Sequence, residues 1–88
     1  MKLKENLILR EIAGSWIIVP VGEMVVEFNG LMNVSESGAL LWKNLVDGST
    51  EDNLVDILLN EYSVDRETAK ADVEEFISQL KEKGLLCQ

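Results

Sequence analysis

Residues 24–42, MVVEFNGLMNVSESGALLW, contain the change from strand to helix on which the predicted fold depends. Asn29-Gly30 stands between two apolar runs, Val25–Phe28 and Leu31–Val34. Because Asn and Gly readily take the positive φ angles of a tight turn, this pattern predicts a β-hairpin. Ser35 comes next and precedes an apolar pattern with helical spacing, which is typical of an N-cap. We therefore expect strands up to this point and a helix after it.

The flanking segments continue this order. Two earlier strands are predicted at Leu7–Ile12 and Trp16–Val19, which are rich in residues that suit a sheet. Helical spacing and cap residues predict three helices: from Glu36 to about Val46, from after the N-cap candidate Ser49 to about Asn60–Tyr62, and from after Asp65 to before Gly84. Strands followed by helices indicate an α+β fold. We predict one domain over residues 1–88, winged helix-turn-helix-like, with a small antiparallel β-sheet of three to four strands followed by three α-helices.

Charge and composition narrow the function. The chain has 16 acidic and 8 basic residues, a net charge of −8 and no histidine. Such a surface repels nucleic acid and anionic membranes, because affinity for phosphates depends on clustered Lys and Arg. Ser-His and Cys-His catalysis and ordinary zinc sites need a histidine. No apolar run approaches the roughly 20 residues that cross a bilayer. The lone Cys87 suits a reducing compartment. We expect a cytoplasmic protein with no cofactor and no metal.

Three other functions fit the residues less well. Asp72, Glu74 and Glu75 are more typical of a solvated helix face than of catalytic carboxylates. Ser37 begins a helix, as the phosphopantetheine serine of a carrier protein does, but carrier domains are all-helical. A DNA-binding winged helix would read DNA with its last helix, whose exposed residues are mostly acidic here. We therefore expect no enzyme. An acidic interaction or regulatory domain is the main alternative to peptide binding, and a carrier protein is the third.

An outer strand before the first helix suggests how a peptide would bind. The edge of a small sheet offers unpaired N–H and C=O groups. An extended peptide can join such an edge as an added strand, with main-chain hydrogen bonds for affinity and flanking pockets for specificity. The other interpretation is that the last helix simply covers this edge, and composition does not separate the two.

Several motifs, in this order and spacing, resemble those of the PqqD-like family of RiPP recognition elements. The matching stretches, within Leu9 to Leu86, are Val34-Ser35-Glu36-Ser37-Gly38-Ala39-Leu40-Leu41-Trp42, then Leu45-x-x-Gly48, Glu61-Tyr62-x-Val64-Asp65, Asp72-Val73-x-x-Phe76-Ile77-x-x-Leu80 and Gly84-Leu85-Leu86. Ser35 stands where the family usually has Asn, and Ser37 where it has Thr. The link from Pro20 to Leu31 is longer than in members that serve quinone-cofactor synthesis, which we ascribe to the extra strand Val25–Phe28.

The resemblance implies a non-catalytic, leader-peptide-binding adaptor. The leader of a ribosomally made precursor peptide would add as a strand beside Leu31–Val34, in the groove next to the last helix. The adaptor would present the precursor to a modifying enzyme, typically a radical SAM enzyme, and the exposed edge would also permit a homodimer. The peptide-binding residues expected on this basis are Leu31, Met32, Asn33, Val34, Val73, Phe76, Ile77 and Leu80.

Overall fold

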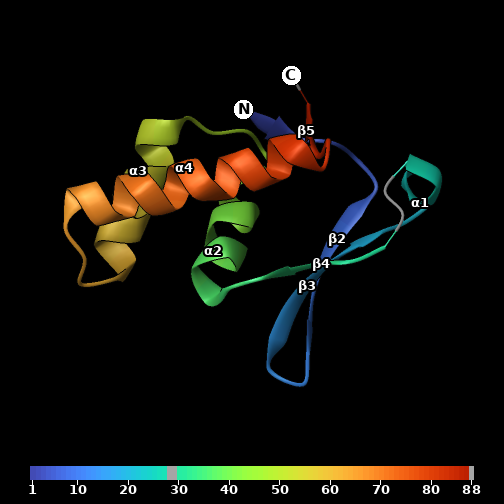
Figure 1. Ribbon diagram of the computed structural model, residues 1–88, viewed down its shortest axis with the longest axis horizontal. Coiled ribbons are helices and arrows are strands. Elements are labelled where there is room, and N and C mark those ends of the chain that lie inside the picture. The colour runs from blue at the N-terminus through green and yellow to red at the C-terminus, as the bar shows by residue number, and fades with distance from the viewer. Residues whose placement is uncertain (28–29, 88) are drawn as a thin grey trace.

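The structure is a computed structural model that describes residues 1–27 and 30–87 (Figure 1). Three antiparallel strands, β2 (Leu7–Ile12), β3 (Ser15–Pro20) and β4 (Met32–Val34), form a sheet in the order β2-β3-β4. The helices α2 (Glu36–Leu45), α3 (Glu51–Glu61) and α4 (Arg66–Glu82) follow the sheet in the chain. The predicted α+β class, with a small antiparallel sheet followed by three helices, is confirmed.

A tight turn joins β2 to β3. Its two central residues, Ala13 and Gly14, have φ angles of 51° and 81°. Positive φ at both positions defines a type I′ turn, whose twist matches that of the flanking strands. The register follows directly, with Ile12 opposite Ser15 and Arg10 opposite Ile17. The hairpin reaches beyond the helices, as Figure 1 shows.

The strand predicted at Val25–Phe28 is wrong. Residues Met24–Glu27 form a short helix, α1, and Phe28 and Asn29 of the predicted hairpin lie outside the described residues. Met24 reaches the core, whereas Val25 and Val26 are 53% and 86% exposed. Their N–H groups bond to carbonyls of the preceding turn, Val25 to Gly22 and Val26 to Glu23. A single helical turn therefore satisfies this backbone without any partner strand.

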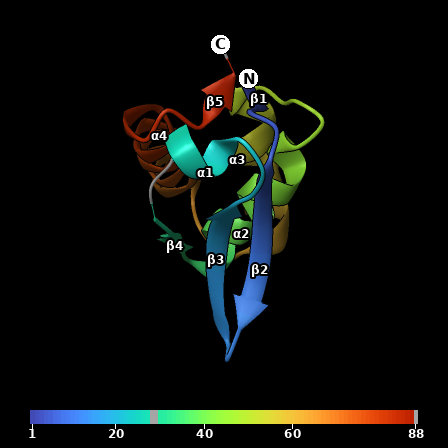
Figure 2. The same ribbon diagram turned by 90° about the vertical axis from the view of Figure 1, so that its right-hand side faces the viewer.

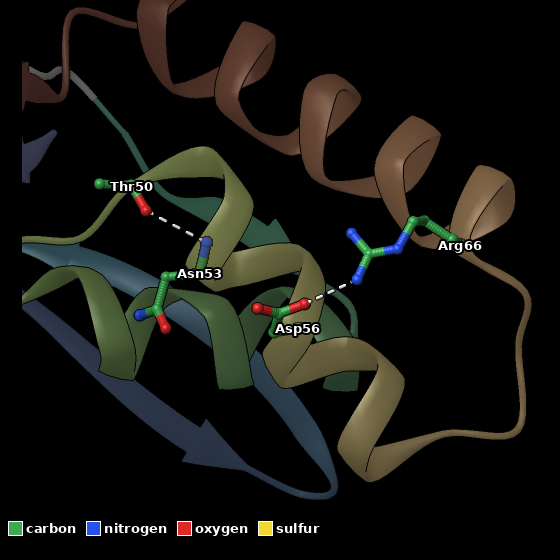
Figure 3. A network of polar contacts seen from close by, with 4 residues as sticks. All are labelled: Thr50, Asn53, Asp56 and Arg66. Carbon is green, nitrogen blue, oxygen red and sulfur yellow. Dashed lines mark hydrogen bonds and ion pairs between the residues drawn. The ribbon is translucent and has the colours of Figure 1, made fainter.

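Side chains cap α2 and α3 at their N-termini. Ser35 caps α2 as predicted, because its hydroxyl accepts the Gly38 N–H at 3.1 Å. The cap of α3 is Thr50 rather than the predicted Ser49: the Thr50 hydroxyl accepts the Asn53 N–H at 3.1 Å (Figure 3). The Ser49 hydroxyl instead accepts from the Asn53 side-chain amide at 2.8 Å. Both hydroxyls therefore accept hydrogen bonds from Asn53, and Thr50 is the N-cap because it accepts the bond from the backbone N–H.

Both ends of α4 follow the sequence prediction. The Asp65 carboxylate accepts the Thr68 N–H at 2.8 Å and caps the helix. At the other end, Gly84 has a φ of 70°, and the Leu85 N–H bonds to the Leu80 carbonyl at 2.9 Å. This is the Schellman ending expected from a glycine after the last turn. An ion pair of 2.9 Å between Arg66 and Asp56 also joins α4 to α3 (Figure 3).

The core lies between the helices and the inner face of the sheet. It is entirely apolar in the described residues, with Ile18 from β3, Trp42 from α2, Leu58 from α3 and Leu80 from α4 each at most 2% exposed. Within the same ranges, no helix combines the length and apolar character that crossing a membrane requires.

The sequence did not predict a second, two-stranded sheet that joins the two ends of the chain. It pairs β1 (Lys2–Leu3) with β5 (Leu86–Cys87). Both strands are too short to show a pattern of alternating side chains. Figure 1 shows the two ends together, next to the C-terminal end of α4.

Candidate functional site

The strand β4 has an open edge. It pairs with β3 on one side, and no other strand within residues 1–27 and 30–87 pairs with its opposite side. Figure 2 shows β4 on the side of the sheet nearer to α4, with β2 on the far side. Because α1 replaces the expected hairpin partner, the edge that faces α4 is available for a further strand.

The turn between β2 and β3 determines which backbone groups of β4 point outward. In such a turn the Ile12 carbonyl accepts the Ser15 N–H, so these two residues form a hydrogen-bonded pair. Hydrogen-bonded and non-bonded pairs alternate along an antiparallel ladder, so Glu11 and Trp16 form a non-bonded pair and Arg10 and Ile17 form the next bonded pair. Ile17 then has no group left for Asn33, its neighbour in β4. The Asn33 N–H and C=O therefore point toward the open edge.

A hollow of about 310 Å³ lies between β4, the start of α2 and α4, and we call it the β4–α4 hollow. Buried Leu41 and Phe76 provide its apolar lining, and they are 1% and 6% exposed. Two carboxylates of α4 lie on its wall, those of Asp72 and Glu75. The full set of lining residues is Asn33, Val34, Ser35, Ser37, Gly38, Leu41, Asp72, Glu75, Phe76 and Gln79.

Gly38 lets three elements meet at this hollow. A Cβ atom at this position would lie 3.3 Å from the Ser35 hydroxyl and 3.4 Å from both the Phe76 ring and the Val34 Cβ. These distances are at the close limit of side-chain contact. The absence of a side chain therefore brings α2 close to both β4 and α4, which sets the width of the hollow.

A second hollow of about 380 Å³ opens on the other side of the α2 start, and we call it the Tyr62 hollow. Its apolar lining comes from Leu58, Tyr62 and Val64, at the end of α3 and in the loop that follows. Burial raises the pKa of the Tyr62 hydroxyl, and the nearby carboxylates of Glu36 and Glu61 raise it further. This hydroxyl therefore stays neutral at physiological pH and can donate a hydrogen bond.

The predicted binding residues fall into two groups. Asn33, Val34 and Phe76 line the β4–α4 hollow, and Leu31 is 61% exposed just before β4. The other four point into the core and are at most 4% exposed: Met32, Val73, Ile77 and Leu80. Their side chains hold β4 and α4 in place. Whether a peptide contacts any of the eight stays a prediction.

Seven of the ten lining residues were not among the predicted binding residues: Ser35, Ser37, Gly38, Leu41, Asp72, Glu75 and Gln79. The helical periodicity of the sequence could have identified the three that lie in α4, Asp72, Glu75 and Gln79. Positions 72, 75 and 79 are one step around the helix from the buried stripe Val73, Phe76, Ile77 and Leu80, so they border its edge. Within the described residues, no group of three or more Asp, Glu, Cys or His side chains is placed to hold a metal ion.

Two solved structures share the fold of this chain. The solved structure of TbiB1 in complex with the TbiA(beta) leader peptide is 26% identical, with a TM-score of 0.78, and the match covers 98% of this chain and 94% of that one. The structure of lasso peptide synthetase B1 complexed with the leader peptide has the same fold at 21% identity, with a TM-score of 0.76 and coverage of 99% and 96%. No curated protein sequence matches the chain.

A family model gives the classification. The model for coenzyme PQQ synthesis protein D (PqqD) matches residues 16–86, which run from β3 to β5 and include both hollows. The match confirms the resemblance seen in the sequence motifs. The chain therefore belongs to the PqqD family.

Proposed function

We propose that this protein is a non-catalytic adaptor that binds the leader of a ribosomally made precursor peptide and presents it to a modifying enzyme. The observation that carries the proposal is the open edge of β4, where the Asn33 N–H and C=O point toward α4 beside a hollow. TbiB1, which shares the fold at 26% identity, was solved with a leader peptide. The leader would add to the sheet as a fourth strand, by β-augmentation.

Magnitudes show what the edge alone can supply. One outward-facing residue offers two main-chain hydrogen bonds, each worth about 0.5–1.5 kcal/mol net. Micromolar binding needs about 8 kcal/mol. Most of the affinity must therefore come from leader side chains that fill the β4–α4 hollow and bury its apolar lining. The main-chain hydrogen bonds therefore set the register of the leader, and its side chains determine which leader binds.

The proposed adaptor works in the cytoplasm with a modifying enzyme of the radical SAM class. The whole chain acts as one peptide-recognition domain. The leader contacts Leu31–Val34 together with the α4 residues near Phe76. A homodimer through the same β4 edge would compete with the leader, because one edge pairs with one strand at a time.

A titration of this protein with the leader of the precursor peptide that is encoded next to its gene tests this function. Calorimetry should give micromolar or tighter binding, and a scrambled leader should not bind. Backbone amide shifts should be largest in β4 and along the wall formed by residues 72–79. Shifts confined to β2 or to the β1–β5 sheet would contradict the site. Mass spectrometry should show an unchanged leader after incubation with this protein alone, and a modified leader would contradict the non-catalytic role.

A further inference from the structure

The β4–α4 hollow has a chemical preference that the open edge does not explain. Its polar groups are two carboxylates, Asp72 and Glu75, together with the hydroxyls of Ser35 and Ser37 and two side-chain amides. All ten lining residues belong to the described part of the chain, and none of them is Lys or Arg. The surrounding protein adds to this potential, because its net charge is −8. A cationic side chain therefore fits this hollow better than a neutral or acidic one.

The two hollows adjoin at the start of α2, and together we call them the passage. Ser35, Ser37 and Asp72 line both of them. On the far side of these residues the carboxylate of Glu36 lines the Tyr62 hollow together with two apolar side chains, Leu58, which is buried, and Val64, which is 37% exposed. A peptide strand that pairs with β4 and continues in the direction of Ser35 therefore passes Asp72 and then reaches Tyr62. The surface becomes more apolar along that path.

We propose that the passage selects leaders by sequence: a Lys or Arg that lies between Asp72 and Glu75, and an aliphatic or aromatic residue a few positions away that enters the Tyr62 hollow. The inference rests on the proposed function and specifies its substrate class. The cation gains from two carboxylates and loses little hydration, because hydroxyls and amides surround it. The apolar residue gains by burial against Leu58 and Val64.

Selection from random twelve-residue peptides displayed on phage, carried out on the full chain, tests the preference. Peptides are kept when they bind the wild-type protein, and a parallel selection is run on the double variant Asp72→Asn/Glu75→Gln for comparison. The enriched peptides should share a basic residue and, at a fixed offset, an apolar one. Enrichment of peptides without a basic residue would overturn the inference. If no peptide binds the wild-type chain at all, both the inference and the proposed function fail.

Matched charge variants then distinguish the effect of the two carboxylates in the hollow from the effect of the net charge of the protein. With a selected peptide, Asp72→Asn/Glu75→Gln should weaken binding about tenfold, because two facing carboxylates are lost. The control Glu74→Gln/Glu82→Gln removes the same charge from exposed positions of α4 that line neither hollow. It should change the dissociation constant by less than about twofold, since rim charges contribute little. Equal effects of the two double variants would show that only net charge matters and would overturn the inference.

A second pair of variants tests the apolar half of the passage. Val64→Ser should weaken binding about threefold, because it places a hydroxyl in the Tyr62 hollow. Val46→Ser is the control, since Val46 is 51% exposed at the end of α2 and lines neither hollow. If Val64→Ser binds as tightly as wild type, the peptide does not reach Tyr62. A leader that binds with unchanged affinity to all these variants would refute the inference and leave the proposed function standing.

Discussion

The two outer strands of the sheet share the same partner, β3, and differ in what surrounds them. β2 is six residues long, and its exposed side chains include the charges of Arg10 and Glu11. β4 is three residues long, carries no charge and runs beside α4. Charged side chains discourage an edge strand from pairing with another chain. β4 lacks this protection, and a hollow lies next to it.

The two open edges differ in whether a second element forms a wall beside them. α4 is that wall, and buried side chains such as Val73 and Leu80 fix its position. β2 has outward-facing backbone groups of the same kind, but it lies on the side of the sheet away from α4 (Figure 2). Variants in matched positions of the two strands and in the wall can test each part of this explanation.

The largest effect is expected when the wall loses its core anchor. Leu80 is fully buried, so Leu80→Ala should lower the free energy of unfolding by about 2–5 kcal/mol. The matched change in the other outer strand, Ile8→Ala, affects a side chain that is 38% exposed and should cost less than about 1 kcal/mol. Urea denaturation of both variants measures the difference. Similar losses would mean that β2 is anchored as firmly as α4.

The next largest effect is expected from proline in the two open edges. Asn33→Pro removes the outward N–H of β4, which forms one of the two expected hydrogen bonds to the leader, and should weaken leader binding about 2- to 12-fold. Glu11→Pro is the control, because the ladder alternation also points the Glu11 N–H away from β3. It should destabilise the sheet to a similar extent and leave leader affinity unchanged. Calorimetry measures the affinity of each variant for the leader. Thermal unfolding shows whether the two variants are destabilised to the same extent.

A smaller effect is expected from narrowing the hollow. Gly38→Ala adds a Cβ at 3.3–3.4 Å from Ser35, Val34 and Phe76. Leader affinity should fall about threefold, because these neighbours must move apart. Stability should change by less than about 1 kcal/mol, since the higher helix propensity of Ala offsets the crowding. Asn44→Ala, on the exposed side of the same helix, serves as the control. Unchanged affinity in Gly38→Ala would show that the leader does not approach α2.

The smallest effect is expected at the start of the wall. Hydrogen bonds from the Thr68 side chain and then its backbone N–H lower the pKa of Asp65. A folded-state pKa below the unfolded value gives stability above the unfolded pKa, near 4, that is lost as the pH falls through the folded pKa.

The variant Asp65→Asn isolates this contribution, because Asn still caps the helix but carries no charge. Its melting temperature should lie slightly below that of wild type at pH 7, and the gap should close as the pH falls below about 4. A gap that stays constant from pH 7 to pH 3 would contradict the role of the ionised carboxylate. Circular dichroism of both proteins over this range is sufficient.

Local signals in the sequence were enough to predict most of the fold. Ser35, Asp65 and Gly84 mark helix ends through contacts within a few residues of each, so their roles can be read without a structure. The strand predicted at Val25–Phe28 failed for a different reason. Two apolar runs around an Asn-Gly pair describe a segment that can pair, and only the tertiary structure determines whether a partner strand is there. The β1–β5 sheet was missed for the same reason, because its two strands are distant in the chain and the pairing depends on the tertiary structure.

The site was harder to predict than the fold. Apolar residues of α4 were assigned to the groove because the pattern identifies a buried stripe, but it does not separate the core from a hollow at its margin. Val73 and Leu80 lie in the core, whereas Asp72 and Glu75, one step around the helix, line the hollow. The outward direction of the Asn33 backbone depends on a turn about twenty residues earlier, through the register of two ladders.

The position of Cys87 has a practical consequence. It is the chain's one cysteine, its thiol is exposed, and it lies in β5 opposite Lys2, in a strand that lines neither hollow. A maleimide reagent would therefore attach a fluorophore or a sensor surface at a single defined point. Molecules immobilised through this thiol would all be held in one orientation, with the β4 edge left accessible. Single-molecule recordings of leader arrival and departure could then be made on the wild-type protein, without an engineered tag.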